Sequence, residues 1–185
     1  MIYHWKTILR NGIPLLTLCV CIEIFAGQIL QTNKQTLVLF PLLLISIPVI
    51  NSVGGNIGSI LGSRLASGLH IGSINLTIHD KTMHKNFIGV LGIGLLTYAI
   101  LGLLIYYIAT VGNVEMNIGL YPFVSIILAT GILLIIIIAL MSVATAFISF
   151  KKGVDPDDMV APVVTTAGDT FGILLLFIVV GVVGL

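Results

Sequence analysis

The chain has 185 residues, of which 58% are hydrophobic and only 8% are charged, and its formal net charge is +1. Roughly a quarter of the residues in a soluble domain are charged, so this composition excludes a chain that folds in water and predicts a membrane protein. The near-neutral charge gives no reason to expect a nucleic-acid partner.

Several apolar runs are long enough to cross a bilayer, which takes about 20 residues of helix. In chain order there are five, covering approximately residues 12–30, 37–65, 87–110, 118–150 and 160–185. The fourth is long enough to require tilt or an extension into water. The longest polar stretch, about 68–86, is too short to fold alone. The sequence therefore predicts an all-α, multi-pass protein of the cell membrane, with residues 1–185 forming a single domain of five transmembrane helices.

The basic residues predict how these helices are oriented, because Lys and Arg are retained on the cytoplasmic side of short loops. Seven of the eight basic residues precede the first run or lie near the connections from the second to the third and from the fourth to the fifth. These seven are Lys6, Arg10, Arg64, Lys81, Lys85, Lys151 and Lys152. Only Lys34 lies on the other side. We therefore expect the N-terminus in the cytoplasm and the C-terminus outside.

Two acidic residues, Glu23 and Asp169, lie inside the predicted spans. At about 1.5 Å rise per residue, Glu23 is roughly 16 Å into the first span and Asp169 roughly 13 Å into the fifth, so the two can share a level near the middle of a roughly 30 Å core. A charged side chain there costs about 2.5 to 3.5 kcal/mol on insertion scales. An intramembrane carboxyl is therefore a candidate functional group. Glu23 also argues against a cleaved signal peptide in the first run.

Asp169 is the better surrounded of the two carboxyls. Thr165 and Thr166 lie one helical turn before it and extend it into a polar stripe. Pro162 lacks an N–H and clashes with the preceding turn, which would free carbonyls near residues 158–161 toward a cavity. These groups could supply oxygen ligands. The alternative is structural: Asp169 hydrogen-bonds a neighbouring helix, and the threonines bond back to their own carbonyls.

The second run is the other irregular segment. Gly54, Gly58 and Gly62 form overlapping GxxxG units, which predict close helix packing. Four polar residues recur at helical spacing and form a separate face beside the glycines. They are Ser52, Asn56, Ser59 and Ser63. That face either lines a pore or makes hydrogen bonds between helices, and Asn56 is the best candidate for a pore oxygen.

The fifth run is preceded by an acidic segment. Asp155 and Pro156 form a typical N-cap and first-turn pair, and Asp158 completes an arrangement similar to a capping box. With Asp157, the segment also places three carboxylates at the inner mouth, where they would concentrate cations.

Taken together, these motifs resemble a known family. The Gly-Gly-Asn-Ile-Gly-Ser segment at 54–59, continuing through 63–65, resembles the second-helix signature of MgtE-type magnesium transporters. Residues 155–158 and 162–169 are similar to their fifth-helix signature, especially that of the animal solute-carrier relatives of MgtE. Residues 23–27 resemble the first helix of those relatives. The resemblance covers nearly the whole chain.

The resemblance implies a five-helix membrane domain that works as a homodimer, with a Mg²⁺ path near the dimer axis. It implies that Asp169 is the central ligand and that Asn56 faces the path. Bacterial MgtE proteins also carry an N-terminal cytoplasmic domain and a CBS pair that sense Mg²⁺, whereas this chain begins about eleven residues before its first predicted helix. We therefore expect that form of regulation to be absent.

Mg²⁺ is usually held by one or two carboxylates while it keeps several waters. We expect Asp169 from each subunit to meet near the axis, with Thr165, Thr166 and Asn56 orienting waters. Glu23 would decide between a passive channel and an exchanger, because a second intramembrane carboxyl could carry a coupled Na⁺ or H⁺. Its structural alternative is a protonated acid hydrogen-bonded between helices. Transport, and not catalysis, is the expected function.

Two other classes of function find some support in the sequence. Ala167-Gly168-Asp169 loosely resembles the Gly-Asp signature of intramembrane aspartyl proteases, but such an enzyme needs two aspartates and this chain would have to supply an unusual dyad across a dimer. The small size is also compatible with a structural subunit of a larger complex.

Overall fold

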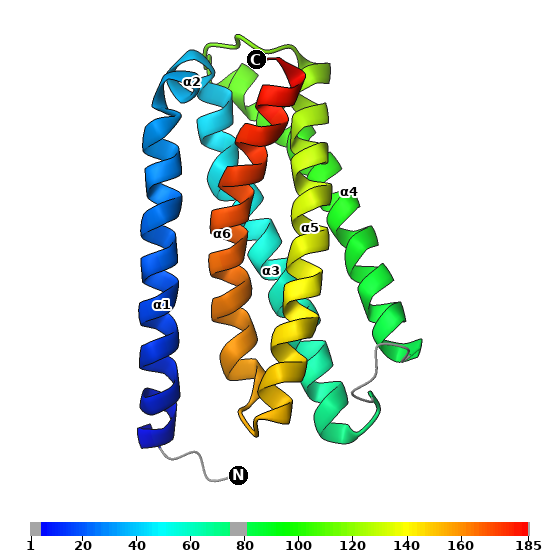
Figure 1. Ribbon diagram of the computed structural model, residues 1–185. Helices are drawn as coiled ribbons and strands as arrows, with labels where there is room; N and C mark the ends of the chain where they lie inside the picture. The colour runs from blue at the N-terminus through cyan, green and yellow to red at the C-terminus, as the bar shows by residue number, and fades with distance from the viewer. Residues whose placement is uncertain (1–4, 75–80, 185) are drawn as a thin grey trace.

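The computed structural model describes residues 5–74 and 81–184, all of whose regular structure is helical. The helices are α1 (Trp5–Thr32), α2 (Lys34–Leu39), α3 (Pro41–Ile71), α4 (Lys81–Val111), α5 (Leu120–Lys151) and α6 (Pro156–Val183) (Figure 1). Within the described residues, five of these helices are long and apolar enough to cross a membrane, and α2 is the exception. The predicted all-α architecture with five spans is confirmed.

The start of the second span differs from the prediction. We expected one apolar helix from residue 37, but α2 ends at Leu39 and α3 begins at Pro41. The residue between them, Phe40, adopts φ −127° and ψ 75°. The cause is Pro41: its ring disfavours helical geometry at the preceding residue, while its fixed φ suits the first turn of a new helix. The short α2 therefore turns the chain from α1 into α3.

The start of α6 confirms the predicted N-cap and first-turn pair of Asp155 and Pro156. Asp155 is the N-cap, and its carboxylate accepts a hydrogen bond from the backbone N–H of Asp157 at 3.1 Å. Pro156 occupies the first turn, where a backbone N–H would have no partner within the helix, so the missing N–H of proline costs no hydrogen bond.

The centre of the bundle is formed by α3, α5 and α6, which all pack against one another (Figure 1). α4 covers α3 and α5 on one side. α1 packs lengthwise against α6 on the other and, in the described part of the chain, does not contact α3. α6 therefore has α1 and α3 as separate neighbours.

The three glycines of α3 allow its close approach to α5 and α6. A Cβ at Gly58 would lie 2.5 Å from Ile138 Cγ2 and 2.8 Å from Val164 Cβ. At Gly54 it would lie 2.8 Å from a methyl of Leu134, and at Gly62 it would overlap a side chain of α6. The predicted role of these glycines in helix packing is confirmed.

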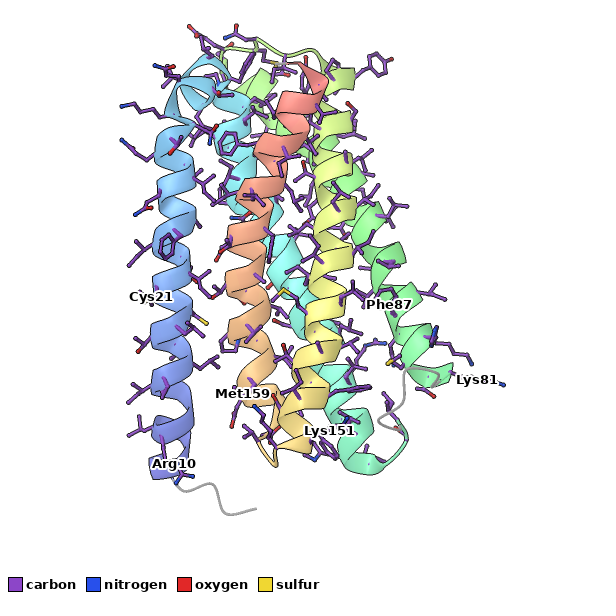
Figure 2. The ribbon with its side chains drawn as sticks, in the orientation of Figure 1. Arg10, Cys21, Lys81, Phe87, Lys151 and Met159 are labelled. Carbon is purple, nitrogen blue, oxygen red and sulfur yellow. The ribbon has the colours of Figure 1, made fainter. Side chains whose placement is uncertain are left out.

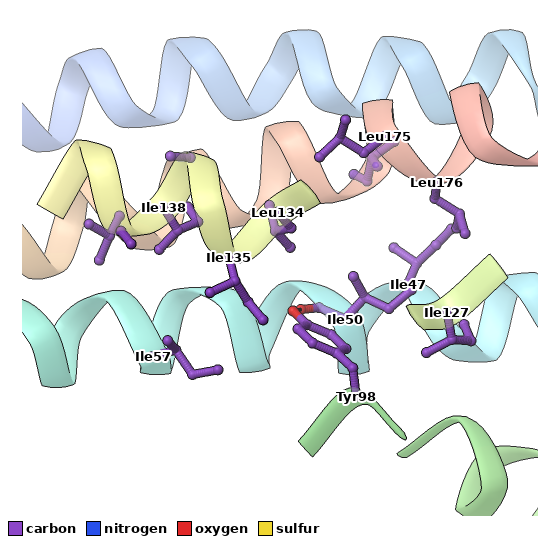
Figure 3. Packing of buried hydrophobic residues seen from close by; sticks show 14 of the residues in the cluster. Ile47, Ile50, Ile57, Tyr98, Ile127, Leu134, Ile135, Ile138, Leu175 and Leu176 are labelled. Atoms are coloured by element: carbon purple, nitrogen blue, oxygen red, sulfur yellow. Dashed lines mark hydrogen bonds between the residues drawn. The ribbon is translucent and has the colours of Figure 1, made fainter. Parts of the chain in front are cut away.

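Tyr98 of α4 is the largest fully buried side chain of the core. Its ring lies against Gly131 of α5, where a Cβ would overlap the ring. Its hydroxyl donates a 2.8 Å hydrogen bond to the backbone carbonyl of Ile50 in α3, with Leu134 and Ile135 nearby (Figure 3). This bond satisfies the only polar atom of the tyrosine side chain in an apolar region, and it ties α4 to the middle of α3.

Basic side chains gather at one end of the bundle. Arg10, Lys81 and Lys151 lie at that end, whereas Lys34 belongs to α2 at the opposite end (Figure 2). At the first end, His70 Nε2 lies 3.6 Å from Asp155 Oδ1. The unequal distribution agrees with the sequence pattern, and the orientation in the membrane stays a prediction.

Candidate functional site

Asp169 lies near the middle of α6, which spans 28 residues. Its side chain is half-buried. One turn earlier, Thr165 is exposed and its hydroxyl donates to the carbonyl of Ala161 at 2.8 Å. The back-bonding alternative therefore holds for Thr165, although its hydroxyl oxygen can still accept from water.

Thr166 points in a different direction from Thr165. It is buried, and its hydroxyl donates a 3.0 Å hydrogen bond to Glu23 Oε1 of α1. Glu23 itself is exposed, and its partner Thr166 lies three residues before Asp169 on α6. The two intramembrane acids therefore lie at a similar level, as their depths in the sequence indicated. The bond suits either alternative for Glu23, since both a protonated and an ionised carboxyl can accept from a hydroxyl.

Asn51 of α3 approaches Asp169 from the bundle side, and sequence reasoning missed it. Its side chain is only 7% exposed, and its Nδ2 donates to the backbone carbonyl of Asp169 at 3.3 Å. α6 comes this close because of Gly168, where a Cβ would lie 3.1 Å from Gly55 N and 3.2 Å from the Asn51 carbonyl oxygen. The signal that could have identified Asn51 is its amide in the middle of an apolar span, beside the glycine face.

The predicted polar face of α3 lies along the seam between α3 and α6. Ser52 and Asn56 are exposed and share a 3.4 Å contact between Asn56 Nδ2 and Ser52 Oγ. Thr165 sits directly on Gly55, since a Cβ there would lie 3.3 Å from Thr165 Cα. The seam therefore brings Asn56 and Thr165 to one side of the bundle. Glu23 and Thr166 lie on the α1 side of α6.

Toward the basic end, the seam widens into a groove of about 310 Å³. Its lining residues are Ser59, Ile60, Ser63, Asp157, Val160 and Ala161. We define the polar strip as the polar side chains that follow the seam from this groove to the middle of α6. Its members are Ser52, Asn56, Ser59, Ser63, Asp157, Thr165 and Asp169. The strip leads from one end of the bundle to the intramembrane carboxylate.

The strip offers oxygen atoms of several kinds. They are the carboxylates of Asp169 and Asp157, the amide of Asn56 and hydroxyls, which suit hard cations such as Mg²⁺ better than soft metals. In residues 5–74 and 81–184, no three His, Cys, Asp or Glu side chains come together as a ready-made metal site. Near the middle of α6 the strip therefore offers one carboxylate among neutral oxygens, and Asp157 adds a second carboxylate at the groove.

Comparison with known proteins agrees with this chemistry. Residues 47–179, well over half of the chain, match the sequence model of MgtE, which is described as a divalent cation transporter. The chain belongs to the MgtE family. That family consists of transporters and not of enzymes, and the five spans make this member a multi-pass membrane protein.

The chain is also similar to animal solute carriers. It is 28% identical to solute carrier family 41 member 2 of Mus musculus and of Homo sapiens, over 92% of this chain and 32% of each relative. It is 29% identical to the Xenopus laevis protein of the same name, over 94% of this chain and 33% of that relative. The MgtE chain thus spans about a third of the length of these relatives. No solved structure matches it.

Proposed function

We propose that the chain transports Mg²⁺ or a related divalent cation across the membrane as a homodimer, with Asp169 of each subunit as the central ligand. The observation that carries the proposal is the polar strip on an uncovered side of α3 and α6. A carboxylate facing hydrocarbon costs about 2.5 to 3.5 kcal/mol, and unpaired polar groups such as the amide of Asn56 add to that cost. A second copy of the chain would remove the strip from lipid and enclose a hydrated path.

Two-fold symmetry would set the two strips against each other, because the same surface of each subunit forms an isologous interface. Asp169 from both subunits would then present two carboxylates to one ion, which matches the usual way proteins hold a partly hydrated Mg²⁺. Thr165 and Asn56 would orient the remaining waters. Thr166 would act on the α1 side of α6, through its hydrogen bond to Glu23.

The orientation follows from the basic residues: the end that carries Arg10, Lys81 and Lys151 would face the cytoplasm. The groove beside Asp157 then opens at the inner mouth. Carboxylates at such a mouth raise the local concentration of cations, so they favour ion entry or exit there.

The ligand role is tested by Mg²⁺ flux into liposomes that contain the purified protein. Asp169→Ala is expected to abolish flux, and Asp169→Asn, which keeps the size but removes the charge, to weaken Mg²⁺ affinity strongly. Glu115→Gln is the control, because Glu115 is an exposed carboxyl in the connection between α4 and α5. Normal flux in Asp169→Ala would refute the proposed ligand.

The dimer is tested separately by cysteine cross-linking in a chain whose native cysteines are replaced by serine. Asn56→Cys is expected to cross-link two subunits, because the two strips would face each other across the axis. Ile93→Cys is the matched control, since Ile93 is 57% exposed on α4, away from the seam. If Asn56→Cys cross-links no better than Ile93→Cys, the proposed interface is wrong.

A coupled exchanger is the second candidate, and the position of Glu23 beside Asp169 favours it. A second carboxyl at the level of the ion path, bonded to α6 through Thr166, could carry a Na⁺ or H⁺ in exchange for Mg²⁺. An imposed Na⁺ or pH gradient should then drive Mg²⁺ movement, and Glu23→Gln should remove only the driven part. Gradients that have no effect on wild-type flux would leave the passive channel as the function.

A further inference from the structure

A line of side-chain hydrogen bonds crosses the middle of the bundle and ends at Asp169. Tyr98 of α4 donates to the carbonyl of Ile50, and the next residue of α3, Asn51, donates to the carbonyl of Asp169 in α6. We call Tyr98, Asn51 and their two carbonyl partners the crossbar. The crossbar runs from α4 through α3 to α6, and its Asn51 bond holds the turn of α6 that carries Asp169 in a defined position against α3.

The amide of Asn51 is enclosed by small residues of α6. A Cβ at Gly172 would overlap Asn51 Oδ1, so only glycine leaves room for the amide there. Asn51 is only 7% exposed, and its Nδ2 is the group that donates to the backbone carbonyl of Asp169. Asn51 thus binds the main chain of the proposed ligand from inside the bundle.

The buried amide of Asn51 lowers the stability of the fold, and this loss indicates a role beyond packing. Within the described residues, Asn51 Oδ1 is buried without a hydrogen-bond partner. A buried acceptor without a partner destabilises a fold, whereas an apolar side chain of the same shape often does not. The carbonyl of Asp169 also lies inside a helix, whose own ladder supplies a second donor to it. Stability alone therefore gives little reason for an amide at this position.

We infer that Asn51 is a positioning residue for the ion site, which orients Asp169 toward the open face of the strip. The inference rests on the proposed function of Asp169. Partners behind a metal ligand set its orientation, and their removal typically lowers metal affinity by about 10- to 100-fold. Asn51 itself touches no ion in this account; it acts through Asp169.

The test combines two independent changes with Mg²⁺ flux in liposomes and thermal unfolding of the same preparations. Asn51→Leu replaces the amide by an apolar side chain of similar shape. Gly172→Ala keeps Asn51 but places a methyl group where its Oδ1 lies. Both variants are expected to raise the half-saturating Mg²⁺ concentration by about tenfold and to retain the maximal flux. Asn51→Leu should also unfold at the wild-type temperature or above it.

Two matched controls accompany these variants. Gly181→Ala makes the same change in α6 at a position with open space, and Ser46→Ala removes another buried polar group of α3, whose hydroxyl donates to the carbonyl of Leu43 in the same helix. Both should keep the wild-type Mg²⁺ dependence. A tenfold shift confined to Asn51→Leu and Gly172→Ala supports the inference.

Two results would overturn it. One is an unchanged half-saturating concentration in Asn51→Leu when Asp169→Asn shifts it. The other is a loss of flux at every Mg²⁺ concentration together with a lower unfolding temperature, which would make Asn51 a structural residue. Failure of the proposed function itself would be recognised separately, because the Asp169→Ala variant with Asn51 intact would then show full flux.

Discussion

Gly58 offers the most direct test of the helix packing that forms the seam. Replacing it with alanine adds one methyl group at the point where α3 meets α5 and α6. The added Cβ would lie 2.5 Å from Ile138 Cγ2 and 2.8 Å from Val164 Cβ, both much closer than the roughly 3.5 to 4.0 Å of an optimal carbon contact. Both neighbours are β-branched residues in helices, where one χ1 rotamer dominates, so neither can rotate away easily.

The expected cost follows from these contacts. Overpacking of a filled core costs about 1 to 3 kcal/mol, and a clash with two stiff neighbours belongs near the top of that range. Alanine returns about 1 kcal/mol through its higher helix propensity. The net loss is therefore about 2 kcal/mol. For a chain of this size that loss corresponds to a decrease in unfolding temperature of roughly 4 to 8 °C.

The measurement is thermal unfolding of purified protein in one detergent, with Gly92→Ala as the matched control. Gly92 lies in α4, and a Cβ there would meet no atom within 4 Å, so the control keeps the helix-propensity gain and omits the clash. Gly92→Ala is expected to unfold at the wild-type temperature or slightly above it. A Gly58→Ala protein as stable as Gly92→Ala would show that α3, α5 and α6 do not meet at this glycine.

Three further predictions test other parts of the architecture. Tyr98→Phe removes a buried 2.8 Å hydrogen bond to α3 and should lower the free energy of unfolding by about 1 kcal/mol, measured as a lower unfolding temperature. Tyr98→Trp should shift the unfolding temperature by a different amount. Thr166→Val removes the hydroxyl that bonds α6 to α1. In a chain whose other native cysteine is replaced by serine, this change should speed maleimide labelling of Cys19, which is 7% exposed. An unchanged labelling rate would mean that apolar contacts alone hold α1 against α6. With both native cysteines replaced, Lys34→Cys should react with an impermeant maleimide on intact cells and Lys152→Cys only after lysis, and the reverse pattern would invert the proposed orientation.

The sequence predicted the spans well because each depends on a sum over about 20 residues, so single exceptions matter little. It also predicted the beginning of α6, where Asp155 and Pro156 act locally on adjacent backbone. The break at Phe40 depends on a single proline inside an apolar run, and hydropathy averaged over a span does not detect it. A rule that treats Pro41 as a helix start would have found it.

The candidate site was predicted less completely, because its members face one another across helices that are distant in the chain. Adjacent residues on a helix differ by about 100° in direction, which is why Thr166 reaches Glu23 while Thr165 lies on the seam. The sequence placed both threonines in one stripe, since both precede Asp169 by about a turn. Deciding between them required the position of α1.

Asn51 and Asn56 illustrate the same limit on a single helix. Five residues apart, they point about 140° away from each other, so only one of them can share a face with the serines that step along α3. Asn56 belongs to that regular pattern, which is why the sequence favours it as a pore oxygen. Asn51 lies on the glycine side of α3, where its contacts depend on Gly168 and Gly172 of α6, more than a hundred residues later in the chain. A buried amide opposite two glycines is a feature of a helix pair, and neither helix carries the signal alone.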